Sequence, residues 1–290
     1  MLQGLYSAAS GMEAQQTQLN AISNDLSNAD TPGYQSVNVG FEDLLYSSGG
    51  VSSGSTVATG AGAQASIVGR DTTDGATTDT QRPLDVGIQG DGFFRVADGT
   101  PPGSPPYTAT FTNPSYTRAG DFTTNSLGFL TTQTGMYVIG KNAVAAGTAP
   151  NVTYTAGTSD SYINVPPGSS GVAIGQDGSV SYVDANPSSS TYQQRVTAGY
   201  ISMASFPNEA GLQRDGGSLW SQSASSGSAV VGTPNTGGFG QTLGGQLEMS
   251  NVDMATEFTN MIEAQRGYEA NASAITTADQ MLQTVVQMKQ

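Results

Sequence analysis

Apolar residues at both ends of the chain recur at seven-residue intervals. Near the N-terminus the register and the positions three residues beyond it include Leu5, Met12, Leu19, Ile22 and Leu26. Near the C-terminus the register and the positions four residues beyond it include Met254, Phe258, Met261, Tyr268, Ile275, Leu282 and Val286. This spacing is typical of the narrow seam of a coiled coil rather than of the wider apolar face of a globular helix. We therefore predict one helix at each end of the chain.

Local signals set the bounds of the two predicted helices. Thr31-Pro32-Gly33 ends the first helix, because proline disfavours helical geometry in the residue before it and glycine suits a turn. Asn251 or Asp253 can cap the second helix at its start. The sequence therefore marks the C-terminal end of the first helix and the N-terminal end of the second, which we call their inner ends.

Between the helices the pattern changes to short alternating runs bounded by turn residues. These runs cover residues 84–96, 116–140, 163–183 and 195–206. Asp177-Gly178 separates two β-rich runs and is a strong hairpin signal. Antiparallel pairing is favoured because no crossover helix is visible. The fold class is therefore predicted to be α+β, with terminal helices and a β-rich antiparallel middle.

The same pattern predicts a division into domains. Residues 1–34 and 246–290 form a discontinuous helical assembly domain, and residues 83–220 form a β-rich outer domain. Residues 35–82 and 221–245 are expected to be linkers or extended segments, because Gly, Ser, Thr and Ala dominate most of their length. A Pro-rich surface loop is expected at 98–106.

The charge balance excludes several kinds of partner. Among 290 residues there are 9 Lys and Arg against 23 Asp and Glu, which gives a net charge of −14. Nucleic acid and anionic membrane surfaces are disfavoured, because both need clustered basic residues. Over most of the surface, the excess of acidic residues is explained by the solubility that it gives to a monomer.

The sequence offers little for catalysis. It has no Cys and no His, which removes the commonest nucleophile–base pairs and most transition-metal sites. Acid pairs such as Glu42-Asp43 and Asp71/Asp74 are better read as solvated surface. The stretch from Gly87 to Gly92 has the wrong spacing for a dinucleotide loop and favours a tight turn. We predict no enzyme activity, no metal, no cofactor and no small-molecule substrate.

Two interpretations of the terminal helices compete. They could pack on the β-domain as ordinary core, or they could mediate assembly with other copies of the chain. Assembly is favoured because the apolar stripe is narrow, the helices lie at opposite ends of the chain, and low-complexity segments flank the β-region. Both helices are acidic, so apolar packing has to hold them together. We expect the twelve register residues named above to be the subunit contacts, ordered only on assembly.

The N-terminus has no basic segment followed by a long apolar one, so we expect no cleaved Sec signal. No stretch reaches the roughly 18 apolar residues of a membrane span. An exported chain of this kind would use a route that does not cleave such a signal.

Several motifs together resemble the flagellar rod and hook protein family. At the start these are the segments 4–12, 20–28 and 31–34, in the middle 84–94 and 116–122, and at the end 247–253 and 261–271. Segments 41–46 and 277–282 are most similar to distal rod members of the family. The motifs cover both ends and much of the middle, in the order that the family has.

The resemblance implies an assembly with defined partners. The terminal helices would form an inner coiled-coil tube around an export channel, and the β-rich middle an outer shell. It also implies export as an unfolded chain by the flagellar type III apparatus. Expected partners are copies of the chain, other rod proteins, the hook and a ring bushing. A hook or proximal rod subunit, an exported adhesin or tail-fibre-like module and a wall-cleaving enzyme are the alternatives.

Overall fold

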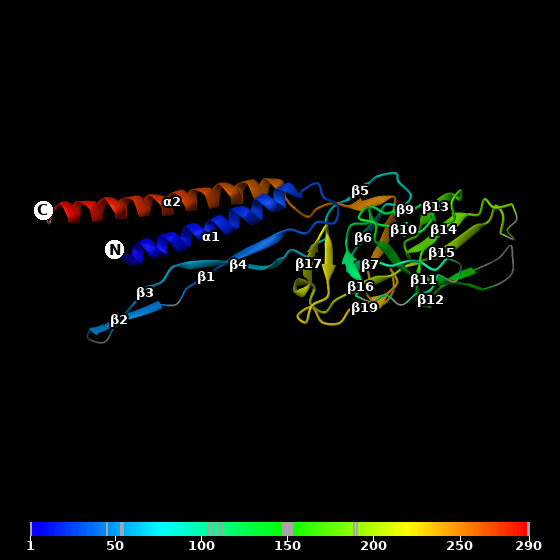
Figure 1. Ribbon diagram of the computed structural model, residues 1–290, viewed down its shortest axis with the longest axis horizontal. Helices are drawn as coiled ribbons and strands as arrows, with labels where there is room; N and C mark the ends of the chain where they lie inside the picture. The colour runs from blue at the N-terminus through cyan, green and yellow to red at the C-terminus, as the bar shows by residue number, and fades with distance from the viewer. Residues whose placement is uncertain are drawn as a thin grey trace. The chain divides into compact units, whose positions relative to one another are not determined.

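A computed structural model describes residues 2–288 except 45, 53–54, 104, 106, 110, 112, 147–152, 188 and 190. Along the sequence a long helix comes first and another comes last, with antiparallel strands between them, so the predicted α+β class is confirmed (Figure 1). The chain divides into two compact units. Unit 1 contains residues 1–29, 36–71 and 252–290, and unit 2 contains residues 30–35 and 72–251.

Unit 1 is built around two antiparallel helices, α1 (Leu2–Ser27) and α2 (Met254–Gln287), which lie side by side in Figure 1. Gly11 on α1 lies beside Asn271 on α2, and Gly267 on α2 lies beside Gln15 on α1. In the described part of the unit there are also four strands, β1 (Val37–Asp43), β2 (Tyr46–Ser52), β3 (Ser55–Gly60) and β4 (Ala63–Arg70). β1 pairs with β4 and β2 pairs with β3, both antiparallel.

The inner ends of the helices follow the local sequence signals. Asp253 caps α2: its carboxylate accepts a hydrogen bond from the Ala255 amide at 3.0 Å and another from Thr256 Oγ1 at 2.9 Å. α1 ends at Ser27, just before the predicted turn. In that turn Gly33 has a φ of +64°, and a Cβ there would lie 2.5 Å from the Ala119 amide nitrogen. Only glycine fits this position without strain.

Residues 35–82, expected to be a linker or an extended region, contain paired strands. β1 to β4 lie in this stretch, paired as ladders, and β5 follows before its end. The linker expectation rested on the side chains, which are mostly small and polar. Ladder hydrogen bonds involve backbone groups, so Gly- and Ser-rich strands can still pair when a partner strand lies opposite.

Unit 2 is all-β in its described part, apart from one short 3-10 helix, η1 (Glu209–Gly211). Its main sheet has 13 strands among the described residues, with the central order β13-β14-β15-β11-β7-β8-β18-β17. The described strands of the unit are β5 (Thr77–Asp79), β6 (Val86–Gln89), β7 (Phe93–Ala97), β8 (Ser115–Thr117), β9 (Thr123–Thr124), β10 (Leu130–Thr131), β11 (Tyr137–Ala146), β12 (Thr153–Tyr162), β13 (Ser170–Ile174), β14 (Ser179–Val183), β15 (Arg195–Ile201), β16 (Met203–Ser205), β17 (Gln213–Gly216), β18 (Leu219–Ser221), β19 (Val230–Gly232), β20 (Gln241–Gly244) and β21 (Gln246–Glu248).

The predicted hairpin at Asp177-Gly178 is confirmed. β13 pairs with β14 across this turn, and Gly178 has a φ of +75°. Two segments differ from expectation. Residues 221–245, expected as a linker, contain β19 and β20, and residues 246–248, expected with the helices, form β21 in unit 2. Short strands next to Gly-rich turns give too little periodicity to be told from a linker.

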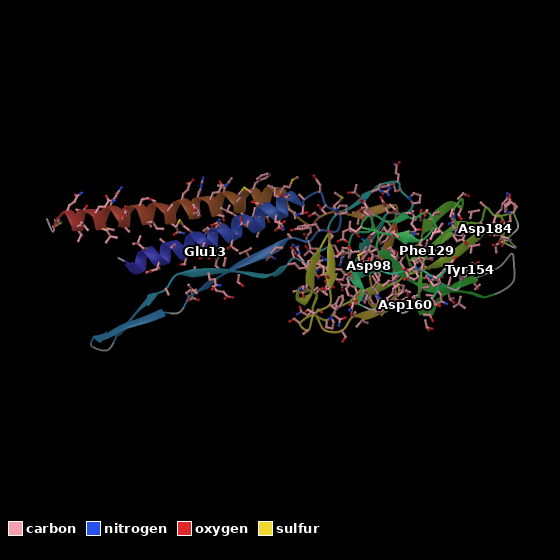
Figure 2. All side chains as sticks on the ribbon, in the orientation of Figure 1. Glu13, Asp98, Phe129, Tyr154, Asp160 and Asp184 are labelled. Atoms are coloured by element: carbon pink, nitrogen blue, oxygen red, sulfur yellow. The ribbon has the colours of Figure 1, made fainter. Side chains whose placement is uncertain are left out.

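The described residues of unit 2 form two buried apolar clusters. The larger contains Val86, Ile88, Phe94, Val96, Phe122, Leu130, Val138, Ile163, Val165, Ile174, Val180, Ile201 and Met203, and the smaller contains Phe93, Tyr116, Ala204, Phe206, Leu212 and Trp220. A separate group of rings surrounds Phe129, which Figure 2 labels. Tyr107 meets Phe129 edge-on at 5.1 Å between ring centres, and Tyr162 does so at 6.0 Å. Edge-to-face packing of this kind anchors the segment that follows the Pro-rich loop.

Candidate assembly surface

α1 and α2 approach each other closely at a glycine on each helix, Gly11 and Gly267. Ala14 on α1 and Ala264 on α2 are both buried. A Cβ at Gly11 would lie 2.7 Å from Asn271 Nδ2, so glycine lets the two backbones approach closely at this point. A Cβ at Gly267 would likewise lie 3.0 Å from the Gln15 side chain, so the close approach extends over both glycines.

The structure separates the predicted contact residues into two groups. Ile22 is buried, and Leu5, Met12, Leu19, Leu26, Met261, Ile275 and Leu282 are half-buried. The exposed group is Met254 at 53%, Phe258 at 50%, Tyr268 at 40% and Val286 at 63%. Part of the apolar stripe thus holds the helix pair together, and part of it remains on the surface of the molecule.

Sequence reasoning missed further exposed apolar residues on α2. Ile262 is 50% exposed and follows Met254 and Phe258 at four-residue intervals, so the three lie on one side of the helix. We name Met254, Phe258 and Ile262 the α2 stripe. The four-residue spacing was the signal that could have found Ile262, because a strict seven-residue register excludes it.

The far end of α2 extends past the start of α1, as Figure 1 shows. Met281, Val285, Val286 and Met288 are all between 49% and 83% exposed in this region. α1 also lies along β4 and β1 within unit 1, and Tyr6, at 71%, is the large apolar side chain that it exposes among the described residues. Within the described residues, uncovered apolar surface in unit 1 is therefore concentrated on α2.

Electrostatics weaken the helix pair rather than strengthen it. Asp25 on α1 is buried, and its Oδ2 accepts a hydrogen bond from the Val37 amide at 3.1 Å. Burial raises the pKa of the Glu257 carboxyl on α2, and the charge of Asp25 adds to the rise. Apolar and small-residue packing must outweigh this repulsion, as the sequence led us to expect.

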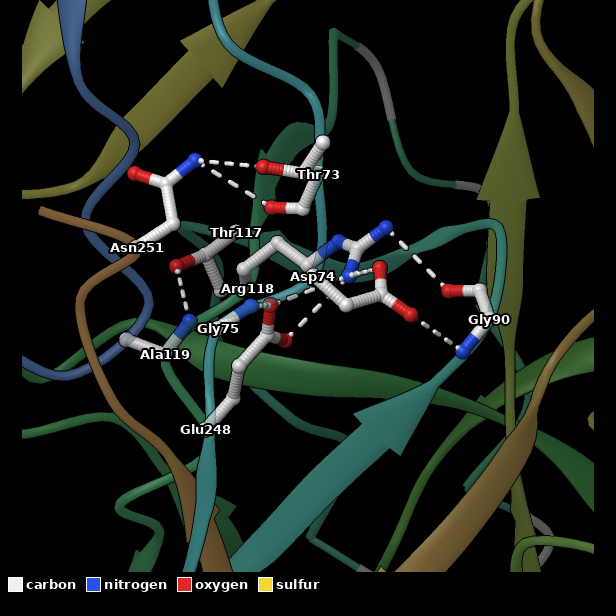
Figure 3. A network of polar contacts seen from close by, with 9 residues as sticks. All are labelled: Thr73, Asp74, Gly75, Gly90, Thr117, Arg118, Ala119, Glu248 and Asn251. Atoms are coloured by element: carbon white, nitrogen blue, oxygen red, sulfur yellow. Dashed lines mark hydrogen bonds and ion pairs between the residues drawn. The ribbon is translucent and has the colours of Figure 1, made fainter. Parts of the chain in front are cut away.

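A buried polar cluster lies in unit 2 (Figure 3). Arg118 is 1% exposed, and its Nη1 lies 2.8 Å from Asp74 Oδ1 and 3.1 Å from Glu248 Oε1. Its Nη2 donates to the Gly90 carbonyl at 3.2 Å. Burial raises the pKa of the Glu248 carboxyl, while Arg118 and the Gly75 amide oppose that rise. One guanidinium is shared by two carboxylates from different parts of the chain, so the cluster ties chain segments together.

A second basic side chain holds the turn after α1 against the sheet. The Arg214 guanidinium lies 5.0 Å from the ring centre of Tyr34 and 5.0 Å from that of Trp220. Its Nη2 donates to the Gln35 carbonyl at 2.7 Å. Stacking between two rings together with a hydrogen bond is a geometry that arginine provides and lysine does not.

The described residues contain no cluster of three or more acidic side chains, in a chain without Cys or His, that could hold a metal ion. The stretch from Gly87 to Gly92, expected as a tight turn, is strand β6 as far as Gln89 and then bends, with Gly90 at φ +105° and Gly92 at φ +130°. An open hollow of about 680 Å³ near Lys141 and Asp160 has polar walls. Among the described helices, none is long and apolar enough to cross a membrane.

Three family matches cover most of the chain. Residues 5–35 match the family described as "Flagella basal body rod protein". Residues 87–182 match "Flagellar hook protein FlgE/F/G D1 domain", and residues 243–288 match "Flagellar basal body rod FlgEFG protein C-terminal". The three occur in the order in which the sequence motifs pointed to them.

Individual relatives extend the likeness to the full chain. The "Flagellar basal-body rod protein FlgG" of Bacillus subtilis is 36% identical, with 100% of both chains covered. Its namesake in Caulobacter vibrioides is 36% identical over 99% of this chain and 100% of its own. The "Flagellar hook protein FlgE" of Helicobacter pylori is 48% identical, but over only 31% of this chain and 12% of its own. The chain belongs to the flagellar basal-body rod protein family and is a structural subunit of the flagellar rod, located in the basal body.

Proposed function

We propose that the chain is a subunit of the distal rod, which polymerises through its terminal helices into a hollow helical shaft. The shaft transmits torque and encloses the export channel. The observation that carries the proposal is the α2 stripe, a row of half-exposed Met254, Phe258 and Ile262 on the helix that α1 covers only along one side. The full-length likeness to rod proteins named FlgG supports the distal position.

Burying the α2 stripe would favour assembly substantially. Each large apolar side chain contributes roughly 1.5–3 kcal/mol when it passes from full exposure to full burial. The stripe residues are about half exposed, so each retains about half of that gain for a contact with another copy. The apolar overhang of α2 lies at the other end of the same helix, and two separate patches suit a head-to-tail polymer.

The proposed partners follow from this place in the rod. They are copies of the chain, the proximal rod, the hook, a ring bushing and the flagellar type III export apparatus. A net charge of −14 argues against nucleic acid as a partner. We propose a purely mechanical role without catalysis, small-molecule substrate or cofactor. The hook alternative is weaker, because the hook relative aligns with only 31% of the chain.

A deletion strain of the source bacterium tests the function. Basal bodies from this strain should lack a hook beyond a truncated rod in electron micrographs, and the wild-type chain should restore hooks and swimming. A strain that still builds normal hooks without the chain would exclude the distal rod role.

A double variant tests the α2 stripe. Phe258→Ser with Ile262→Ser should leave the monomer folded but should not restore hooks. The matched control is Val230→Ser with Val231→Ser, which removes two exposed apolar residues from unit 2. If the stripe variant restores hooks as well as the control does, the stripe is not a subunit contact.

A further inference from the structure

The segment from Gln241 to Asn251, which we name the closing segment, pairs with parts of unit 2 that lie far away in the sequence. Its first strand, β20, pairs with β6 over four residues, from Gln241 opposite Gln89 to Gly244 opposite Val86. Its second strand, β21, pairs with β5. Among the described strands, β5 and β6 have no other ladder partner. Both depend on the closing segment for their inter-strand hydrogen bonds.

Further backbone contacts fix the closing segment in place. The Gly245 amide donates to the Asp85 carbonyl at 2.7 Å, and the Thr80 amide donates to the Gly245 carbonyl at 2.9 Å. Thr242 is fully buried, and its Oγ1 donates to the Gly175 carbonyl at 2.7 Å. A Cβ at Gly75 would overlap the Met249 carbonyl oxygen. The segment is therefore a fitted part of the interior and not a strand laid on its surface.

Glu248 places a charge at the centre of these contacts (Figure 3). Its carboxylate accepts bonds from Arg118 at 3.1 Å and from the Gly75 amide at 3.2 Å, and its carbonyl accepts one from the Gly33 amide at 2.9 Å. Without Glu248, the buried Arg118 keeps only one carboxylate partner, Asp74, whose side chain is 40% exposed. Burying the Arg118 guanidinium without Glu248 costs free energy, because one of its two carboxylate partners is missing. Burial of Arg118 is therefore favourable only when the closing segment is in place.

Asn251 ends the closing segment and joins two more chain segments. Its amide donates to the Tyr34 carbonyl at 3.3 Å, and its Nδ2 donates to the Thr73 carbonyl at 3.2 Å. The segment thus contacts residues that follow α1, residues around β5 and the residue after β8. The contacts of Glu248 and Asn251 span from 130 positions, between Arg118 and Glu248, to 217 positions, between Tyr34 and Asn251.

We infer that the closing segment completes unit 2 last, and that residues 30–240 cannot form the native unit without it. Contacts between residues far apart in the sequence form late. Closing the long loop between them lowers the chain entropy before the contacts can offset that cost. A chain that emerges N-terminus first would hold an incomplete unit 2 until its last fifth is present. Under the proposed function, this delay would keep the chain open for export.

A cleavable chain tests the inference. A specific protease site inserted between Gly237 and Gly238, where no neighbouring atom lies within 4 Å of either glycine's would-be Cβ, should leave the uncut chain with its normal melting temperature. The cut chain should remain associated and native. After separation in denaturant, the fragment ending at Gly237 should fail to refold, and adding the fragment that starts at Gly238 should restore the fold.

Trp220, the only tryptophan, reports the outcome because it is buried in unit 2 and lies in the first fragment. Its emission should be red-shifted in the isolated fragment and should shift back on recombination, together with the near-ultraviolet circular dichroism. When the fragment that starts at Gly238 carries Glu248→Gln, at least a tenfold higher concentration of it should be needed to restore the Trp220 emission to the same extent. A first fragment that refolds alone, with a cooperative transition, would overturn the inference. These readouts do not depend on whether the chain builds a rod.

Discussion

Arg118 Nη1 lies 3.1 Å from Glu248 Oε1, and the two side chains are 1% and 2% exposed. The two residues come from segments 130 positions apart, yet they share a site from which water is almost wholly excluded. Removing one partner from a buried pair leaves a charge that neither solvent nor protein neutralises fully. The pair therefore gives a sharp test of how unit 2 is held together.

Glu248→Gln should destabilise the chain by about 3 kcal/mol, because Arg118 remains buried with only Asp74 as a charged partner. The free energy of unfolding can be measured by urea titration with Trp220 fluorescence. Arg118→Met combined with Glu248→Gln should cost less than the sum of the two single changes, because the double variant buries no unpaired charge.

The matched control for this pair is Glu42→Gln on β1, where the side chain is exposed. It should change the free energy of unfolding by less than about 0.5 kcal/mol. Additive effects of the two cluster substitutions would show that Arg118 and Glu248 do not interact energetically.

Ionisation of the Asp121 carboxyl should lower the free energy of unfolding of unit 2 as the pH rises. Burial raises the pKa of its carboxyl above the ordinary 3.8, and the nearby charge of Asp85 adds to the rise, while Arg82 opposes it. A carboxyl with a raised pKa in the folded state contributes stability below the ordinary pKa, and this contribution is lost as the pH rises through the raised pKa. Asp121→Asn should therefore be more stable than wild type at neutral pH.

The measurement for Asp121 is the melting temperature of both chains between about pH 3 and pH 7. The difference between them should shrink below the ordinary carboxyl pKa of about 4, where Asp121 is protonated in the folded and the unfolded chain. A difference that stays constant over this range would mean that Asp121 titrates normally in the folded chain.

Arg214→Lys should cost about 1 kcal/mol although the charge is kept, because lysine cannot stack between Tyr34 and Trp220 while donating to the Gln35 carbonyl. Thermal unfolding followed by Trp220 fluorescence gives the loss. Arg214→Ala is the comparison. If lysine restored full stability relative to alanine, charge alone would account for the contact.

The helix seam can be tested with two glycines of α1. Gly4→Ala should increase helix content, because alanine is about 1 kcal/mol more favourable than glycine in a helix and nothing lies within 4 Å of the added carbon. Gly11→Ala should gain little, because its Cβ would lie 2.7 Å from Asn271 Nδ2. Far-ultraviolet circular dichroism of the dilute chain compares them. Equal gains at both positions would show that the seam is not formed in the free chain.

The helices, their inner ends and the hairpin at Asp177-Gly178 were predictable because each depends on local spacing or on a local capping or turn residue. β1 to β4, β20 and β21 were not. Their side chains are small or mixed, and what makes them strands is a partner strand that can lie more than 150 positions away, as Gln89 does from Gln241. Neither strand of such a pair has to show an alternation of apolar and polar residues in its own sequence.

The contact surface was predictable only in part for the same reason. The seven-residue register located the helices and most of the apolar residues that they carry. It could not show which of them the partner helix covers, because the helices approach closely at Gly11 and Gly267, which carry no apolar side chain for the register to mark. Phe258 and Ile262 remain outside that line, while Ile22 lies within it. The Arg118–Glu248 pair was also missed, since nothing near either residue in the sequence marks it.

Asn251 and Thr73 mark the two ends of the long stretch 72–251, and the Asn251 side chain reaches the Thr73 carbonyl at 3.2 Å. The two ends of that stretch therefore lie next to each other within unit 2. An insert whose ends meet can be enlarged, trimmed or exchanged without changing the register of the helices outside it. The terminal helices can therefore stay unchanged while the β-rich part changes in size or sequence.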